Sequence, residues 1–206
     1  GIRDVAVTGV QTCALPISEL SAKCLVASEK AWTWAKSNPQ VFYRQNQNNE
    51  RFQPAITTGG YEDNQDTDEW YWAAAELFVT THKSQYWEAI AGTDVYWLPI
   101  PSWNSLMSLG VFSLLKAQKQ LPDFTTSKIA QLKNTLLLQA DEMIKGLDSQ
   151  LFRTVMGKSE KDFMWGSSSH AANQSVFLLQ AYSLSAKKTY LEAALGNMDY
   201  LLGRNG

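Results

Sequence analysis

Apolar residues recur at helical spacing along the chain from Leu20 onward. A helix with one buried face carries apolar side chains at positions i, i+3, i+4 and i+7. One such stripe consists of Trp70, Ala73, Ala74, Leu77 and Phe78. Further runs with this spacing cover residues 20–38, 86–91, 106–118 and 129–147, and two more follow residue 166. No segment after residue 18 alternates as a strand would, so the pattern predicts an all-α domain.

Polar segments separate these predicted helices. Asn38-Pro39 ends the first helix, because the residue before a proline avoids the helical region. Residues 40–68 are rich in Asn, Gln, Gly and Asp, which predicts a long loop, and loops of that length are commonly functional or disordered. Residues 92–104 predict a second loop with aromatic anchors, and residues 148–169 predict a third.

One hairpin pattern occurs twice, at an offset of 104 residues. The first copy contains Leu77-Phe78 and Tyr86-Trp87-Glu88-Ala89, and the second contains Ala181-Tyr182 and Tyr190-Leu191-Glu192-Ala193. Repeated helical hairpins build either an open α-solenoid or a closed α/α toroid. The long aromatic loops favour the toroid, because loops at one mouth of a ring can form a cleft.

Composition narrows the classes of function. The 206 residues carry a net charge of −2, which offers no electrostatic basis for binding nucleic acid or an anionic membrane. No apolar run reaches the length of about 18 residues that a membrane span needs. Cys13 and Cys24 match neither a disulfide framework nor a metal finger. Eight tryptophans predict an aromatic core, surfaces that stack on flat ligands such as sugar rings, or both.

We expect the first residues to differ in origin from the rest. Residues 7–17 read VTGVQTCALPI, which resembles the translation of a common sequencing-library adapter. We therefore expect residues 1–18 to be a non-native segment and residues 19–206 to be the protein domain. The alternative is a native segment that forms a short strand over residues 5–10.

Several motifs, in this order, resemble glycoside hydrolase family 9, the endoglucanases that cleave β-1,4-glucans. They are TGGY at 58–61, DEWYWAAAEL at 68–77, SWN leading into LGV within 102–111, WGSSS with a following Ala-Asn within 165–173, and DYLLGRN at 199–205. Each motif alone is moderately specific, and the ordered set is much more so. With AWTWAKSNP before the first loop, the resemblance covers about residues 19–206.

This resemblance implies a partial (α/α)6 toroid of the six-hairpin glycosidase type, with a cleft at one mouth. It also implies an inverting hydrolase, in which one carboxylate activates water and a protonated carboxyl group donates to the leaving oxygen without a cofactor. The expected partner is a β-1,4-glucan polysaccharide such as cellulose. The expected parent is a monomeric protein that is secreted or periplasmic.

The catalytic residues that the family implies are absent from this sequence. The family's base lies in an Asp-Ala-Gly-Asp motif early in the domain, and its acid is a Glu beyond the Leu-Gly-Arg-Asn helix. Asp63 and Asp66 imitate the spacing of the base motif, but their neighbours match a mid-domain motif, so we interpret them as a solvated acidic loop. We predict a fragment that carries no catalytic acid or base and is inactive alone.

Four residues are predicted to contact substrate. Trp103 and Trp165 match positions where family members place ring-stacking tryptophans, and core packing is the alternative for both. His170 stands where Tyr is common in relatives, and either binds a sugar hydroxyl or is satisfied locally at a helix start. Tyr61 is a weaker candidate.

Asp68 and Glu69 match a place where some relatives hold a structural Ca²⁺. A hard cation needs several oxygen ligands, and the acidic loop before Asp68 offers some of them. Such relatives supply a further Asp where this chain has Ser108. The alternative is that both carboxylates stabilise the start of a helix.

Two other functions remain open from sequence. A non-catalytic glucan-binding module would use the same two tryptophans. An α-helical interaction scaffold would keep the tryptophans in its core.

Overall fold

The computed structural model describes residues 2–39, 41–60, 62–150, 152–158, 160–163 and 165–204, with side chains from residue 18 onward except at 161 and 204. Over these residues the backbone forms α-helices joined by loops and short helical turns, and its β structure is one isolated bridge between Ser102 and Ser105. This confirms the all-α prediction. The chain divides into two compact units, Gly1–Asn64 and Gln65–Gly206.

The first unit contains α1 (Ile2–Ser37) and α2 (Gln45–Arg51). Helix α1 ends just before Asn38-Pro39, where the sequence predicts its end. Its backbone is helical from residue 2, so a strand over residues 5–10 is not formed. The assignment of residues 1–18 to a non-native segment stays a prediction.

Helix α2 interrupts the segment 40–68, which the sequence predicts as one continuous loop. Amide side chains in α2 bind the backbone that follows it. Asn49 donates from Nδ2 to the Ile56 carbonyl at 2.9 Å and accepts the Ile56 N–H at 2.8 Å. Gln45 donates from Nε2 to the Thr58 carbonyl at 2.8 Å. The polar composition that indicates a loop therefore also supplies the hydrogen bonds that fold the loop back on a helix.

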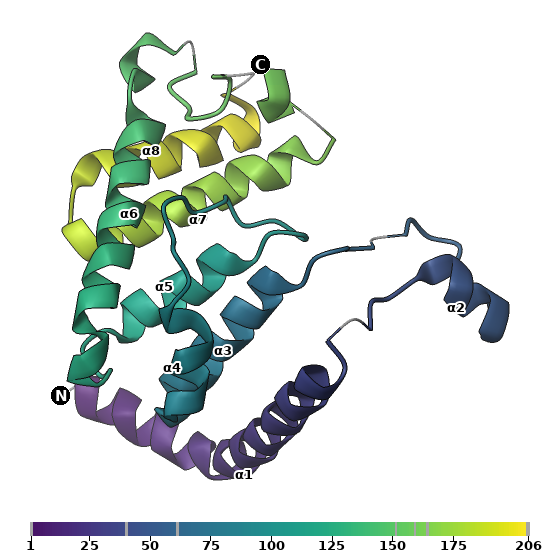
Figure 1. Ribbon diagram of the computed structural model, residues 1–206. Coiled ribbons are helices and arrows are strands. Elements are labelled where there is room, and N and C mark those ends of the chain that lie inside the picture. Colours follow the sequence, from purple (N-terminus) through teal and green to yellow (C-terminus); the bar gives the residue numbers. More distant parts are fainter. Residues whose placement is uncertain are drawn as a thin grey trace. The chain divides into compact units, whose positions relative to one another are not determined.

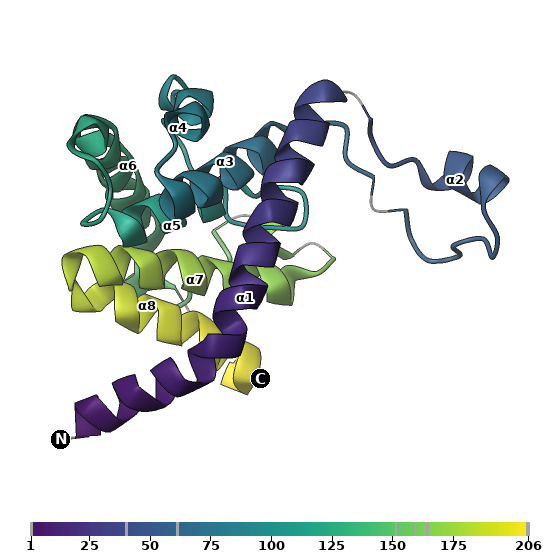
Figure 2. The same cartoon turned by 90° about the horizontal axis from the view of Figure 1, so that it is seen from below.

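The second unit carries the hairpins. Its described residues form α3 (Thr67–Thr81), α4 (Ser84–Ala91), α5 (Met107–Ala117), α6 (Thr126–Ile144), α7 (Ser167–Ser185) and α8 (Lys188–Asp199), followed by a helical turn at Tyr200–Arg204. All of the helices predicted in this region are confirmed. Helices α3, α5 and α7 run in the same direction, with their first residues at one end of the unit (Figure 1, Figure 2).

In the core of this unit, α5 packs against α3 and also contacts α7. The rings of Phe112 on α5 and Phe177 on α7 meet edge to face at a centroid distance of 5.7 Å. Helix α5 approaches α3 closely at Gly110, where a Cβ would lie 3.0 Å from the Cα of Trp72. The absence of a side chain at Gly110 therefore decides how near the two helices come.

The buried face of α3 differs in part from the predicted stripe. Ala74, Leu77 and Phe78 are buried as predicted, but Ala73 is exposed and Trp70 is half-buried. Tyr71 and Ala75 are buried in their place. The reason is tertiary, because the close approach of α5 at Gly110 covers the side of α3 that carries Tyr71 and Ala75.

The two copies of the predicted hairpin share one turn geometry. The first copy reverses at His82, with φ 55°, and the second at Ala186, with φ 56°. Each of these residues donates its N–H at 2.8 Å to the carbonyl four residues earlier, Phe78 O and Tyr182 O respectively. This is a left-handed C-cap, in which the last turn of the helix is closed before the chain reverses.

A hydroxyl group supports the same turn in each copy. Thr81 Oγ1 donates to the Leu77 carbonyl at 2.6 Å, and Ser185 Oγ donates to the Ala181 carbonyl at 2.8 Å. Each hydroxyl then accepts the backbone N–H two residues later, at 3.3 Å and 3.2 Å. The internal repeat seen in the sequence is thus a repeat of structure at the level of single hydrogen bonds.

The loop between α6 and α7 is attached to the end of α6 by Lys158. Its Nζ donates to the carbonyls of Glu142, Met143 and Lys145 at 2.9, 2.8 and 2.9 Å. A helix C-terminus leaves carbonyls without intrahelical partners and carries partial negative charge. An ammonium group stabilises it both by donating hydrogen bonds to those carbonyls and by its positive charge. Burial lowers the pKa of Lys158. The loop also buries Thr154, Val155 and Met156, so it is less polar than predicted.

Gly196 on α8 provides a matched test of this packing. A Cβ at Gly196 would lie 2.7 Å from the carbonyl oxygen of Arg153, whereas its counterpart in the first hairpin, Gly92, has open space around the Cβ position. Gly196→Ala should therefore lower the free energy of unfolding by roughly 1–3 kcal/mol, despite the higher helix propensity of alanine. Gly92→Ala should be neutral or stabilising by less than about 1 kcal/mol. Urea unfolding followed by circular dichroism measures both; equal effects would contradict the contact with Arg153.

Asp141 joins α6 to the start of α8 and gives a pH-dependent prediction. Its Oδ1 accepts hydrogen bonds from Lys187 Nζ at 2.5 Å and Tyr190 Oη at 2.8 Å, and these bonds hold the pKa of the Asp141 carboxyl below its usual value. A lowered pKa stabilises the fold above the unfolded-state value of about 4, and this contribution is lost as the pH falls through the folded-state pKa.

Asp141→Asn should therefore lower the melting temperature near neutral pH, by an amount that corresponds to at most about 1 kcal/mol because the pair is half-exposed. The difference from the unchanged chain should shrink as the pH falls below about 4 and disappear below the folded-state pKa of Asp141. Thermal melts across this pH range measure it, with Asp94→Asn at an exposed position as the control. A difference that persists at the lowest pH would show that charge at Asp141 is not the cause.

Candidate functional site

The starts of α3, α5 and α7 are held together by two side chains. Asp68 Oδ2, in the first turn of α3, accepts the backbone N–H of Leu106 just before α5 at 2.6 Å. Asn173 Nδ2, in the second turn of α7, donates to the carbonyl of Pro101 at 2.7 Å. The loop that leads into α5 is thereby fixed on both sides, and the predicted residues that follow are arranged around it.

Trp103 stands at the tip of this loop. Ser102 and Ser105 exchange both backbone hydrogen bonds, at 3.1 and 3.3 Å, which closes a tight turn around Trp103 and Asn104. The Trp103 side chain is 59 % exposed. A large apolar ring held outside the core on a closed turn is an arrangement suited to stacking on a flat ligand.

Trp165 lies just before α7 and is 87 % exposed. The next residue, Gly166, adopts φ +79°, a left-handed conformation that glycine takes without strain. The Gly166 carbonyl then accepts the N–H groups of Ser169 and His170 at 2.9 and 3.4 Å. Trp165 is thus presented at the entry to the helix and is not packed in the core of the described unit.

His170 is half-buried in the first turn of α7 and makes a hydrogen bond inside the unit. Its Nε2 lies 3.1 Å from Nε2 of Gln174, which is buried. Gln174 in turn contacts Asn197 on α8, at 3.0 Å between Gln174 Oε1 and Asn197 Nδ2. The sequence points to His170 as a candidate contact with substrate but not to Gln174 or Asn197. Their only sign in the sequence is a polar side chain at a position where the helical pattern expects an apolar one.

Asp68 and Glu69 are placed where negative charge stabilises the start of α3, but that start has no side-chain capping hydrogen bond. Both lie in the first turn of α3, Asp68 accepts a backbone N–H, and the Glu69 Oε2 atom is buried. Among the described residues, no group of three or more His, Cys, Asp or Glu side chains is arranged to hold a metal ion. The two carboxylates alone do not make up a Ca²⁺ shell, which needs six to eight oxygens. A calcium site therefore stays a prediction, and nothing below depends on it.

The other predicted residues are not part of this arrangement. Tyr61 lies outside the described residues. Asp63 and Asp66 fall in different units of the chain. Asp63 Oδ1 accepts the Asn64 N–H at 2.6 Å, and Asp66 Oδ2 accepts Trp70 Nε1–H at 3.2 Å. Each carboxylate has a local role in its own segment.

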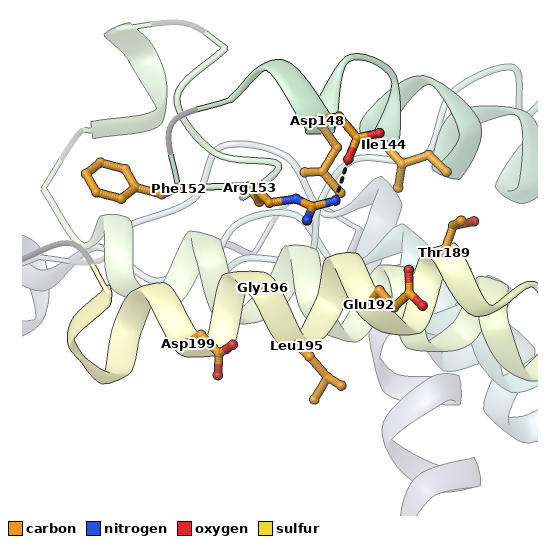
Figure 3. A pocket seen from close by; sticks show the side chains of 10 residues that line it. Ile144, Asp148, Phe152, Arg153, Thr189, Glu192, Leu195, Gly196 and Asp199 are labelled. Atoms are coloured by element: carbon orange, nitrogen blue, oxygen red, sulfur yellow. Dashed lines mark hydrogen bonds and ion pairs between the residues drawn. The ribbon is translucent and has the colours of Figure 1, made fainter.

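A separate groove of about 750 Å³ lies between the end of α6 and α8 (Figure 3). Asp148 and Arg153 form an ion pair on one side of it, and Glu192 and Asp199 of α8 line the other. None of the predicted substrate contacts lines this groove. The aromatic candidates therefore belong to the end of the unit where α3, α5 and α7 begin, and not to this groove.

Comparison with known proteins identifies the family. The model of Glycosyl hydrolase family 9 matches residues 14–206. The chain belongs to this family, and its helices form part of the (α/α)6 toroid, as predicted. A solved structure described as Bacteroides ovatus GH9 superposes with a TM-score of 0.86 at 36 % identity, over 97 % of this chain and 37 % of that one.

Curated relatives extend the comparison. The chain is 39 % identical to the xyloglucan-specific endo-beta-1,4-glucanase BoGH9A of Bacteroides ovatus, over 90 % of this chain and 32 % of the relative. It is 29 % identical to endoglucanase C of Cellulomonas fimi, over 91 % of this chain and 16 % of the relative. The chain thus spans about a third or less of these relatives. No helix that the structure describes has the length and apolar character needed to cross a membrane.

The bond from Asn173 to Pro101 can be tested directly. Asn173→Ala should lower the free energy of unfolding by about 1 kcal/mol, since it removes one side-chain hydrogen bond to a carbonyl. It should also speed amide hydrogen exchange at Ser102 and Ser105, whose turn loses its support on α7. Asn134→Ala, at an exposed position on α6, is the control. Unchanged exchange at both serines would show that the turn is stable without α7.

Proposed function

We propose that this chain forms one wall of the glucan-binding cleft of an inverting endo-β-1,4-glucanase. The observation that carries the proposal is the exposure of Trp103 and Trp165 at the end of the unit where α5 and α7 begin. Both rings lie outside the core, on backbone that turns and hydrogen bonds hold in place. That support reduces the entropy lost when a ligand binds.

The proposed ligand follows from the chemistry of these side chains. A β-linked pyranose presents a flat face of C–H groups, which stacks on an aromatic ring, while its hydroxyls point outward from the ring edge to polar groups. The relatives named above are described as endoglucanases, one of them specific for xyloglucan. A β-1,4-glucan chain is therefore the proposed partner, and the parent is proposed to be a secreted or periplasmic enzyme that acts as a monomer.

The proposed reaction is completed by residues outside this chain. An inverting enzyme needs a carboxylate to activate water and a carboxyl group to protonate the leaving oxygen, about 6.5–9.5 Å apart. Asp63 and Asp66 already accept hydrogen bonds in their own segments. The chain is thus proposed to bind substrate and to contribute no acid or base. Hydrolysis of carboxymethylcellulose by the purified chain, abolished in Asp66→Asn, would contradict this.

Substitution of the exposed tryptophans tests the cleft. Trp103→Ala and Trp165→Ala should each weaken cellotetraose binding roughly fivefold, because one stacking contact contributes about 1 kcal/mol. Trp97→Ala is the matched control. Trp97 is 63 % exposed, but its part of the loop lies alongside α6, where the N–H of the neighbouring Leu98 donates to Gln139. Isothermal titration calorimetry measures the affinities. Equal losses for all three variants would show that binding is not confined to the proposed cleft.

A further inference from the structure

A series of connected hydrogen bonds joins α8 to α7 and ends at His170. The backbone groups at its far end determine which atom donates and which accepts in each bond. Asn197 is fully buried and its Oδ1 lies 2.9 Å from the backbone N of Val155. Because a backbone N–H can only donate, the Asn197 oxygen must face Val155. Its Nδ2 lies 3.1 Å from the carbonyl oxygen of Ala171, which can only accept. The orientation of the Asn197 amide is therefore determined at both ends.

This orientation is passed on to Gln174. Asn197 Nδ2 also donates to Gln174 Oε1 at 3.0 Å, so the Gln174 oxygen faces Asn197. The Gln174 nitrogen then faces His170 Nε2 at 3.1 Å, and an amide nitrogen is a donor only. His170 Nε2 must accept this hydrogen bond. In the neutral imidazole the hydrogen therefore resides on Nδ1.

The second nitrogen of His170 is left for another contact. Among the residues that the structure describes, none accepts a hydrogen bond from His170 Nδ1. His170 belongs to the first turn of α7, and in the sequence it stands between the exposed Trp165 and Asn173, which anchors the Trp103 loop. An N–H donor near stacking rings is the polar group that the hydroxyls on a sugar's ring edge require.

We propose that Gln174 and Asn197 are positioning residues, which hold His170 as the Nδ1–H tautomer so that Nδ1 donates to a hydroxyl of the bound glucan. This inference rests on the proposed function, and it adds the atom that binds and the residues that orient it. Metal-binding histidines are oriented in the same way by a partner on the second ring nitrogen. Here the ligand is a sugar hydroxyl and the orienting partner is a buried amide.

The tautomer is measured by ¹⁵N NMR of the imidazole ring. The chain contains two histidines, so His82→Gln leaves His170 as the single reporter. At roughly pH 9.5, where an imidazole is neutral even beside a carboxylate, Nδ1 should give a protonated-type signal and Nε2 an unprotonated one. Gln174→Glu should reverse this, because a carboxylate accepts from Asn197 and from Nε2–H together. Gln174→Met, which neither donates nor accepts through an amide, should give a mixture.

Gln180→Glu is the matched control, with the same change at a part-exposed position on the same helix. It should leave the His170 signals unchanged. An Nε2–H ring in the unchanged chain, or the same tautomer in Gln174→Glu, would overturn the positioning role. These spectra need no ligand, so they decide that role even if the chain binds no glucan.

The contact with glucan is measured separately, by calorimetry with cellotetraose at the same pH. Gln174→Glu should weaken binding roughly three- to tenfold, the range for one lost hydrogen bond, while Gln180→Glu should not. A reversed tautomer with unchanged affinity would overturn the contact between Nδ1 and the sugar. No binding by the unchanged chain would overturn the proposed cleft itself and this contact with it.

Discussion

The hydrogen bond from the Leu106 N–H to Asp68, with its counterpart from Asn173 to the Pro101 carbonyl, is the constraint on which the rest of the site depends. Each bond connects a helix start to the backbone of one loop. A loop backbone without such partners would leave polar groups unpaired beside the core, at a cost of about 1–3 kcal/mol each. With them, the turn at Trp103 stays closed and its ring remains outside the core.

Buried amides perform a second task in this unit. Asn197 joins α8 to α7 and to the loop before α7, and Gln174 connects this junction to His170. A fully satisfied polar network in a low-dielectric interior is rigid, because every alternative arrangement leaves a donor facing a donor or an acceptor facing an acceptor. The same bonds that hold three segments together therefore also set the orientation of a side chain at the candidate site.

The two copies of the hairpin show which structural features have a local cause and which have a tertiary one. The turns at His82 and Ala186 are alike because the same short-range pattern occurs twice, with a hydroxyl residue before the left-handed position. The helices that follow differ, because α4 ends before Gly92 while α8 continues past Gly196 against the backbone of Arg153. Equivalent positions in the repeat thus have similar turns but different neighbours.

The sequence by itself determined the helices of the second unit, the internal repeat and the family, and it singled out two of the exposed tryptophans, Trp103 and Trp165, because these depend on spacing and on short motifs. Tertiary structure decided which side of α3 is buried, since the approach of α5 at Gly110 replaces Ala73 with Tyr71 and Ala75 in the core. It also decided that Gln174 and Asn197 meet beside His170 and that Lys158 caps α6. These contacts join residues far apart in the chain. The spacing of apolar residues within one helix does not reveal which side chains a neighbouring element places against it.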